Sequence, residues 1–259
     1  MKTGFLKFIT FTFTLLLMCG LKATSQNKVK PYISGEKLVY VAHYGWLNAG
    51  KAIFSIHKSN FEQQNLYHAV AKAKTIGLAD KLFEVRDVYE SYFRPENNHT
   101  YLAIRNISEG RYRYYNEVRY NYQENKVISQ KSGEHEVPDN ILDMLGAFYY
   151  FRESMISRVT KVGDEIVMDT YFADEIFPLK MRYVGDEKIK TKLGKFNTMK
   201  FTPVVEPGRI FDSEDDVTIW ISKDKNYIPV QVRIDLIIGS IKCDLIEYSG
   251  LQHELKYEK

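Results

Sequence analysis

The sequence predicts a mainly β protein, in which a curled antiparallel sheet, half-barrel or clam-like, carries one main helix packed on its concave side. Three observations support this fold class. After Lys30 the chain consists of short runs rich in β-branched and aromatic residues. Turn-forming residues separate these runs at intervals of roughly 8–12 residues, which is the spacing of an antiparallel meander. Only one stretch, residues 138–152, has a convincing helical pattern.

A first series of strands is expected before this helix. Pro95 ends one strand, and Glu109 with Gly110 turns the chain into another. Residues 76–83 lack the two-residue alternation of a strand, so we expect a helical turn there. The expected strands are 37–44, 49–58, 66–75, 86–94, 99–107, 111–122 and 126–133.

The helix pattern begins with Pro138, which suits a first turn, and Asp139 and Asp143 suit the positive end of a helix. Its apolar residues recur at helical spacing and are Ile141, Leu142, Leu145, Phe148 and Tyr149. The strand pattern then resumes over 165–172, 179–185, 195–205, 217–222, 227–238 and 240–248. Pro229 is expected at an edge, a bulge or a ladder gap, and Gly239 at a tight reversal between the last two strands. We expect a single domain over residues 26–259, with a seam between two sub-lobes near 153–164.

The N-terminus has the three parts of a secretory signal peptide. Lys2 and Lys7 make it basic, residues 8–20 are mostly apolar, and small residues at Ala23 and Ser25 suit signal peptidase. The apolar run of about 13 residues is shorter than the ~20 that a spanning helix needs. Cleavage is therefore expected after Ser25, leaving residues 1–25 as signal peptide and no transmembrane segment in the mature chain.

Two other fates of this leader remain open. It could stay uncleaved as a membrane anchor, or Cys19 could be lipidated, although Met18 is larger than the residue that usually precedes such a cysteine. The favoured reading is an exported protein, periplasmic or extracellular. The leader also holds three lysines and no carboxylate, so the mature chain has 33 basic and 33 acidic residues. This balance gives no electrostatic reason to expect nucleic acid or an anionic membrane surface as a partner.

An aromatic strand pattern is the densest local signal. Between residues 111 and 122, Tyr112, Tyr114 and Tyr120 share one face of a strand, and the arginines lie on the other. The alternation favours an amphipathic strand with a tyrosine-rich inner face over base stacking on a cationic groove. These tyrosines could wall a cavity.

No catalytic or metal-binding pattern stands out. The histidines lack zinc spacing, and the acidic residues between 206 and 216 lack the alternation of a calcium loop. No serine lies in a nucleophile elbow, and no glycine-rich loop has the phosphate-binding pattern. We therefore expect no cofactor, no metal and no enzyme activity, although a pair of carboxylates brought together by the fold would leave no linear trace.

Four segments resemble an exported bacterial family, the domain of unknown function 3108. They are the Gly35-Glu36 opening with Gly45–Gly50, the Asp143–Arg152 stretch, the turn at 191–196, and the hairpin from Trp220 to Val230. The resemblance implies export and a mainly antiparallel β fold, and it brings no activity and no catalytic residues. The last hairpin is more distantly similar to periplasmic lipoprotein carriers, which wrap a curled sheet round a cavity closed by helices.

The leading hypothesis is a non-catalytic envelope protein that binds a lipid or another hydrophobic or amphipathic ligand between helix and sheet. The residues expected to line its cavity are Tyr112, Tyr114, Tyr120, Leu145, Phe148, Tyr149 and Trp220, although we favour a structural role for Trp220. The alternative is an envelope interaction or scaffolding protein with a filled core and a protein partner. A carboxylate-based hydrolase is the least favoured. An apolar cavity of several hundred cubic ångströms would favour the first hypothesis.

Overall fold

The computed structural model describes residues 29–155, 159–204, 216–236 and 239–259. The predicted signal peptide (1–25) and Cys19 lie outside the described residues, as does the acidic stretch 206–215. Within the described part of the chain, no helix is long and apolar enough to cross a membrane.

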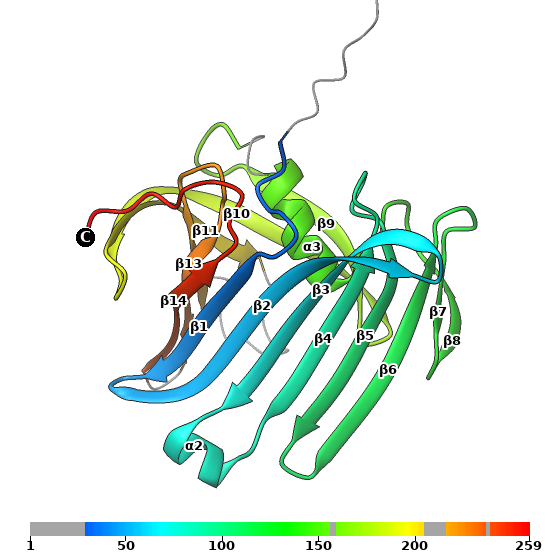
Figure 1. Ribbon diagram of the computed structural model, residues 1–259, viewed down its shortest axis with the longest axis horizontal. Helices are drawn as coiled ribbons and strands as arrows, with labels where there is room; N and C mark the ends of the chain where they lie inside the picture. The colour runs from blue at the N-terminus through cyan, green and yellow to red at the C-terminus, as the bar shows by residue number, and fades with distance from the viewer. Residues whose placement is uncertain (1–28, 156–158, 205–215, 237–238) are drawn as a thin grey trace, which may run out of the picture.

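Fourteen strands form one antiparallel sheet (Figure 1). The chain runs outwards from β1 (Lys37–Tyr44) to β8 (Gly133–Glu136) at one edge, and then crosses to β9 (Glu165–Phe172) at the other edge. From there it returns strand by strand to β14 (Ser240–Ser249), which pairs with β1. The remaining strands are β2 (Leu47–Phe61), β3 (Gln64–Thr75), β4 (Arg86–Phe93), β5 (Thr100–Glu109), β6 (Tyr112–Asn121), β7 (Lys126–Ser129), β10 (Glu175–Lys190), β11 (Lys195–Val204), β12 (Val217–Ser222) and β13 (Pro229–Asp235).

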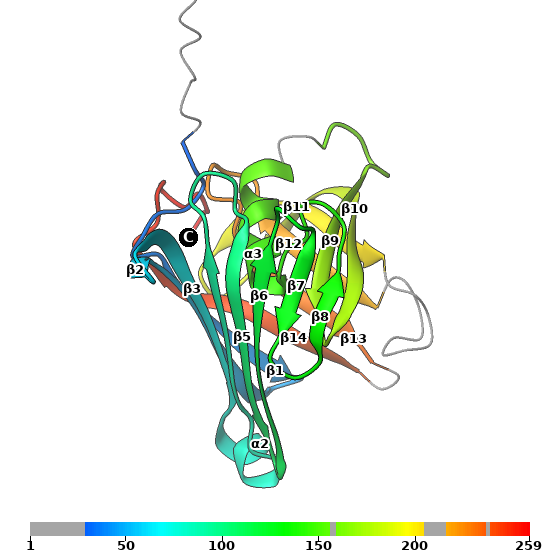
Figure 2. The same cartoon turned by 90° about the vertical axis from the view of Figure 1, so that its right-hand side faces the viewer.

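The crossover segment between the two edges makes the sheet curl. At one end, the Val137 N–H donates to the Asn125 carbonyl, between β6 and β7. At the other, Leu142 forms a parallel bridge with Thr170 of β9. The two edges are therefore held near each other by backbone pairing, and the sheet is curled and unclosed (Figure 2).

The main helix is shorter than the sequence predicts. Instead of starting at Pro138, α3 spans Met144–Tyr150 and continues as the π-helix η1 (Phe151–Met155). Before Asp143, residues 139 and 140 form a turn in which Asn140 has a φ of 60°, and Leu142 is paired with β9, so this stretch is not helical. The Asp143 side chain then accepts hydrogen bonds from the backbone N–H groups of Leu145 and Gly146, which fixes the helix start there.

Helix α3 packs on both halves of the sheet. Leu145 and Tyr149 belong to a core cluster with side chains of β2, β3 and β4. Ala147 and Phe151 belong to another cluster with side chains of β9 to β12. The helix thus packs against both the outgoing and the returning strands. This tertiary packing stabilises a helix of only seven residues, which would be marginal in isolation.

Several local predictions are confirmed. A helical turn, α2 (Gly77–Leu82), occupies the predicted break between β3 and β4. Pro229 pairs with Ile221 where the register of β12 and β13 shifts, which is the irregular ladder position expected for a proline. Gly239, at φ 78°, forms the tight reversal before β14. Strand β8 was not predicted as a separate strand, because the expected strand over 126–133 includes only its first residue, Gly133.

Candidate functional site

A small cavity lies where the start of α3 meets β4, β5 and β6 and the turn between β9 and β10. Its volume is about 40 Å³, enough for a few water molecules at most. Strand register sets its sheet wall: Tyr89 is opposite Arg105, which is opposite Asn116. Because directly paired residues of adjacent strands point to the same side, these three side chains form one row across the sheet, on the side that faces α3.

Arg105 is the central charged group of this wall. Its guanidinium carbon lies 4.3 Å from the centroid of the Phe172 ring, 5.0 Å from that of Tyr114 and 5.9 Å from that of Tyr89. Its Nε atom is buried and has no hydrogen-bond partner. Among the described residues no carboxylate forms an ion pair with it. Three aromatic faces stabilise the cation here, but its hydrogen-bonding capacity is not used fully.

Tyr120 carries the second unpartnered group of the cavity. Its side chain is 8% exposed, and its hydroxyl is buried without a hydrogen-bond partner. Burial raises the pKa of this hydroxyl well above its usual value, so it stays a neutral O–H donor. Arg105 and Tyr120 therefore each bring to the cavity a hydrogen-bond donor that has no acceptor in the protein.

Asp143 forms the floor of the cavity next to the helix start. Its carboxylate accepts hydrogen bonds from Ser91 Oγ at 2.5 Å, from Thr100 Oγ1 at 3.2 Å and from the backbone N–H of Gly146 at 2.9 Å. A Cβ at Gly146 would lie 2.8 Å from Asp143 Oδ2, so a glycine is needed for this approach. Burial raises the pKa of Asp143, and the hydrogen bonds oppose that rise. The carboxylate is fully engaged as a helix cap that ties α3 to β4 and β5.

Asp174 closes the cavity from the opposite edge of the sheet. Ala173 and Asp174 both have positive φ and form the two-residue turn that joins β9 to β10. The turn directs the Asp174 carboxylate towards β6 and β7, where Ser129 Oγ donates to it at 2.7 Å and Asn116 Nδ2 at 3.3 Å. Burial alone would raise the pKa of Asp174, but these hydrogen bonds lower it.

The predicted cavity residues divide into two groups. Tyr120 and Leu145 line the cavity. Tyr114 does not line it, but its ring packs against the guanidinium of Arg105, which does. The other predicted residues lie elsewhere: Tyr112 is 57% exposed at the start of β6, Phe148 and Tyr149 pack in aromatic clusters with Phe54 and Tyr32, and Trp220 is buried. Trp220 donates its indole N–H to Glu187 at 3.0 Å. Sequence reasoning missed Arg105, Tyr89, Phe172 and Asp174.

A second, larger depression of about 290 Å³ lies between the β4–β5 connection and η1. Its lining is mostly polar and includes Asn98, His99 and Glu153. Glu153 already accepts hydrogen bonds from Lys30 and Tyr32. The depression therefore lacks the apolar lining of a site for a hydrophobic ligand.

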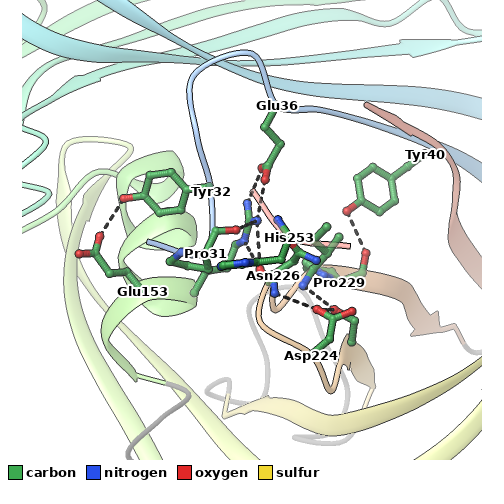
Figure 3. A network of polar contacts seen from close by, with 12 residues as sticks. Pro31, Tyr32, Glu36, Tyr40, Glu153, Asp224, Asn226, Pro229 and His253 are labelled. Carbon is green, nitrogen blue, oxygen red and sulfur yellow. Dashed lines mark hydrogen bonds and ion pairs between the residues drawn. The ribbon is translucent and has the colours of Figure 1, made fainter. Parts of the chain in front are cut away.

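The polar network in Figure 3 contains residues of three of the four motif segments: Glu36, Arg152, and the pair Asp224 and Asn226. Arg152 of η1 donates to Glu36 at 2.6 Å and to the carbonyl groups of Pro31 and Asn226 at 3.2 and 3.1 Å. Asp224 accepts from the backbone N–H of Asn226 at 2.8 Å and from that of Lys256 at 3.1 Å. The network joins the N-terminal segment, η1, the β12–β13 hairpin and the C-terminal segment, so these motif residues are structural.

Comparison with known proteins supports the family and the fold. The family model described as "Protein of unknown function (DUF3108)" matches residues 39–246. No curated protein matches the sequence. Among solved structures, a β-barrel-like protein of domain of unknown function DUF1849 from Brucella abortus is similar with a TM-score of 0.57 at 8% identity, over 84% of this chain and 98% of that one.

A hypothetical protein from Chlamydia trachomatis is more weakly similar, with a TM-score of 0.38 at 14% identity over 88% of this chain and 92% of that one. The likeness to the Brucella protein shows the fold alone, because the identity is low. The cavity and its unpartnered donors therefore provide the main basis for assigning a function.

Proposed function

The chain belongs to the DUF3108 family of proteins of unknown function, and from that premise we propose that it is a non-catalytic protein of the bacterial envelope that binds an amphipathic ligand. The ligand lies between α3 and the concave side of the curled sheet. Its polar head occupies the cavity beside Arg105 and Tyr120.

The observation that carries this proposal is the pair of unpartnered donors in one cavity. Arg105 Nε and Tyr120 Oη are buried without hydrogen-bond partners, and both residues line the same space. Buried donors without partners are rare in folded proteins, because each one costs free energy of desolvation. A ligand that offers acceptor atoms would satisfy both.

The chemistry of these groups indicates the type of ligand. Arg105 forms no ion pair among the described residues, and the carboxylates of Asp143 and Asp174, which line the same cavity, already accept hydrogen bonds from other groups of the protein. The head group that suits Arg105 is therefore an anionic acceptor, a carboxylate or a phosphate. The apolar part of the ligand extends along the same side of the sheet, where Ala71 is opposite Tyr89 and Phe54 is opposite Ala71. Those small and aromatic side chains suit a hydrocarbon chain.

A second candidate function is that of an interaction or scaffolding protein of the envelope. The cavity volume of about 40 Å³ favours it, since ligand pockets usually measure several hundred cubic ångströms. Under the leading proposal, only the head group enters this cavity and the tail lies outside it. A hydrolase remains the least favoured function, because the carboxylates of Asp143 and Asp174 are both held by structural hydrogen bonds.

Export is part of the proposal and is supported by the leader sequence. The basic start, the short apolar run and the small residues at Ala23 and Ser25 are typical of a cleaved signal peptide. The intact mass of the protein recovered from the producing bacterium tests this part, with Gln26 expected as the first residue. A diacylglyceryl mass on a chain that begins at Cys19 would instead place the protein on a membrane surface.

Native mass spectrometry of protein purified from the envelope, followed by lipid extraction, tests ligand binding. We expect a bound amphipathic molecule with an acidic head group, and its loss in Arg105→Leu. Arg182→Leu is the matched control, because Arg182 lies on the surface of β10 in an ion pair with Glu165. A wild-type protein that is free of ligand would favour the interaction protein instead.

A further inference from the structure

Three connections lie together at one end of the sheet (Figure 1). They are the β1–β2 turn, the α2 segment between β3 and β4, and the β5–β6 turn. Backbone hydrogen bonds link them: Ile76 N–H donates to the Ala49 carbonyl, and Gly110 N–H donates to the Glu84 carbonyl. We call residues 44–51, 74–87 and 109–113 the α2 tip.

Large apolar side chains of the α2 tip face solvent. Trp46 at the β1–β2 turn is 92% exposed, Leu82 of α2 is 78% exposed and Tyr112 is 57% exposed. Leu78 and Phe83 are also more than half exposed. Helix α2 has no buried residue, and Leu78 and Leu82 lie four positions apart on the same face of it. Single exposed apolar residues are normal on a protein, whereas a group of this kind on adjacent connections indicates a contact surface.

Cationic side chains surround these apolar groups. The α2 tip contains six basic and four acidic residues, although the mature chain as a whole is balanced. Arg86 pairs with both Asp80 and Glu84, and Asp87 is buried, where it accepts the Ser108 N–H. Among the described residues, Lys81, Arg111 and Arg113 are exposed and form no ion pair. The outer surface of the tip is therefore both apolar and positively charged.

We propose that the α2 tip docks on the surface of an anionic lipid bilayer. Tryptophan and tyrosine prefer the interface between water and hydrocarbon, and lysine and arginine nearby are attracted to acidic head groups. The tip is formed by turns and a short helix that protrude from the end of the sheet (Figure 1), and no described pocket is lined by its apolar side chains. Protruding apolar side chains suit shallow insertion between lipids better than they suit recognition of a peptide, which requires a groove.

One residue of the docking surface, Tyr112, lies at the end of the sheet side that faces α3. From Arg105, the next row along the strands pairs Ile107 with Tyr114, and the row after that pairs Glu109 with Tyr112. The side chain of Tyr112 therefore lies on the same side of the sheet as the cavity. Docking through the tip would therefore present the ligand-binding side of the sheet to the bilayer from which an amphipathic ligand comes, an inference that rests on the proposed function. Docking itself does not depend on it.

Sedimentation with vesicles tests the docking. The probes are vesicles of phosphatidylglycerol and phosphatidylethanolamine, with pure phosphatidylcholine vesicles for comparison. We expect binding to the acidic vesicles that weakens at high salt, and a fall in partitioning of roughly tenfold for Trp46→Ser and for Leu82→Ser. The control is Ile128→Ser, which replaces an exposed apolar residue of β7, 48% exposed and outside the tip. We expect all variants to have the melting temperature of the wild type and the same ligand content, as measured by native mass spectrometry.

Tryptophan fluorescence gives a second readout without any substitution. Trp220 is 4% exposed and Trp46 is 92% exposed, so lipids that carry a bromine quencher reach Trp46 alone. A blue shift and quenching on acidic vesicles support docking. The proposal is overturned if wild-type protein does not bind the vesicles, or if Trp46→Ser and Leu82→Ser bind them as wild type does. It is also overturned if sedimentation velocity without lipid shows a dimer that these two substitutions dissociate, since the tip would then bind a second copy.

Discussion

Arg152 and Glu36 form an ion pair in which each side chain is only 1% exposed, although the residues lie 116 positions apart in the sequence. The guanidinium also donates to the carbonyl groups of Pro31 and Asn226. Arg152 thus connects the π-helix to the segment before β1 and to the β12–β13 hairpin. A buried pair of this kind is stabilising only while both partners and all of its hydrogen bonds are present.

Replacing one partner is therefore expected to destabilise the folded protein strongly. Arg152→Met leaves Glu36 buried without a cation and should lower the free energy of unfolding by about 3–5 kcal/mol in urea titrations. Lys37→Met is the control, because the Lys37–Glu247 pair is exposed and should contribute no more than about 1 kcal/mol. An Arg152→Met protein as stable as the control would show that the buried pair does not hold the segments together.

Two neighbouring tyrosines of the aromatic strand are expected to respond differently to loss of their hydroxyl groups. Tyr122 Oη donates to the Ile141 carbonyl at 2.7 Å and accepts the Thr100 N–H at 2.8 Å, so Tyr122→Phe should destabilise by about 1–3 kcal/mol. The Tyr120 hydroxyl has no partner, so Tyr120→Phe should leave stability unchanged or raise it. Urea titrations of ligand-free protein measure both. Equal losses would mean that the Tyr120 hydroxyl is hydrogen-bonded in solution.

Asp174 is expected to make stability depend on pH in the acidic range. Its pKa is lowered from 3.8 in the folded protein by hydrogen bonds from Ser129 and Asn116. Its contribution is therefore fully present above pH 3.8 and is lost as the pH falls through the lowered pKa. The difference in melting temperature between wild type and Asp174→Asn should shrink over this window. If the difference in melting temperature stays constant with pH, the Asp174 carboxylate does not accept hydrogen bonds from Ser129 and Asn116 in solution.

The sequence predicted the strands well because their signal is local. β-Branched and aromatic runs between turn residues mark the strands, and Pro229 and Gly239 were placed correctly from backbone chemistry alone. The start of the helix was predicted six residues too early, at Pro138 instead of Met144. The pairing of Leu142 with β9, which keeps this residue out of the helix, joins distant parts of the chain and leaves no local pattern.

The candidate site was predicted only in part, for a related reason. The alternation in β6 put Tyr114 and Tyr120 on one face; in the structure Tyr120 lines the cavity and Tyr114 lies against Arg105. Arg105 was missed because β5 has apolar residues on both faces, such as Leu102 and Ala103, so its alternation does not show which face is inner. Asp174 could not be found from the sequence, since its role depends on contact between opposite edges of the sheet.

Leu145 is expected to be important for stability because it is 7% exposed and packs against β2, β3 and β4. Leu145→Ala should lower the free energy of unfolding by about 2–5 kcal/mol, as truncation of a core side chain leaves a cavity. Leu78→Ala is a suitable control, because Leu78 is also helical but is 55% exposed and should change stability by no more than about 0.5 kcal/mol. Similar melting temperatures for the two variants would mean that α3 does not pack on the sheet in solution.

Trp220 is expected to be a structural residue that does not sense ligand. It is 4% exposed, its indole N–H donates to Glu187, and the cations of Lys200 and Arg233 lie 5.7 and 5.6 Å from its ring. In Trp46→Phe, where Trp220 reports alone, the emission should be blue-shifted and resistant to acrylamide. It should also stay unchanged when fatty acid or phospholipid is added, because the cavity beside Arg105 is not lined by Trp220. Emission that shifts in the titration would instead place the ligand against β12, and the binding site would then lie among the returning strands.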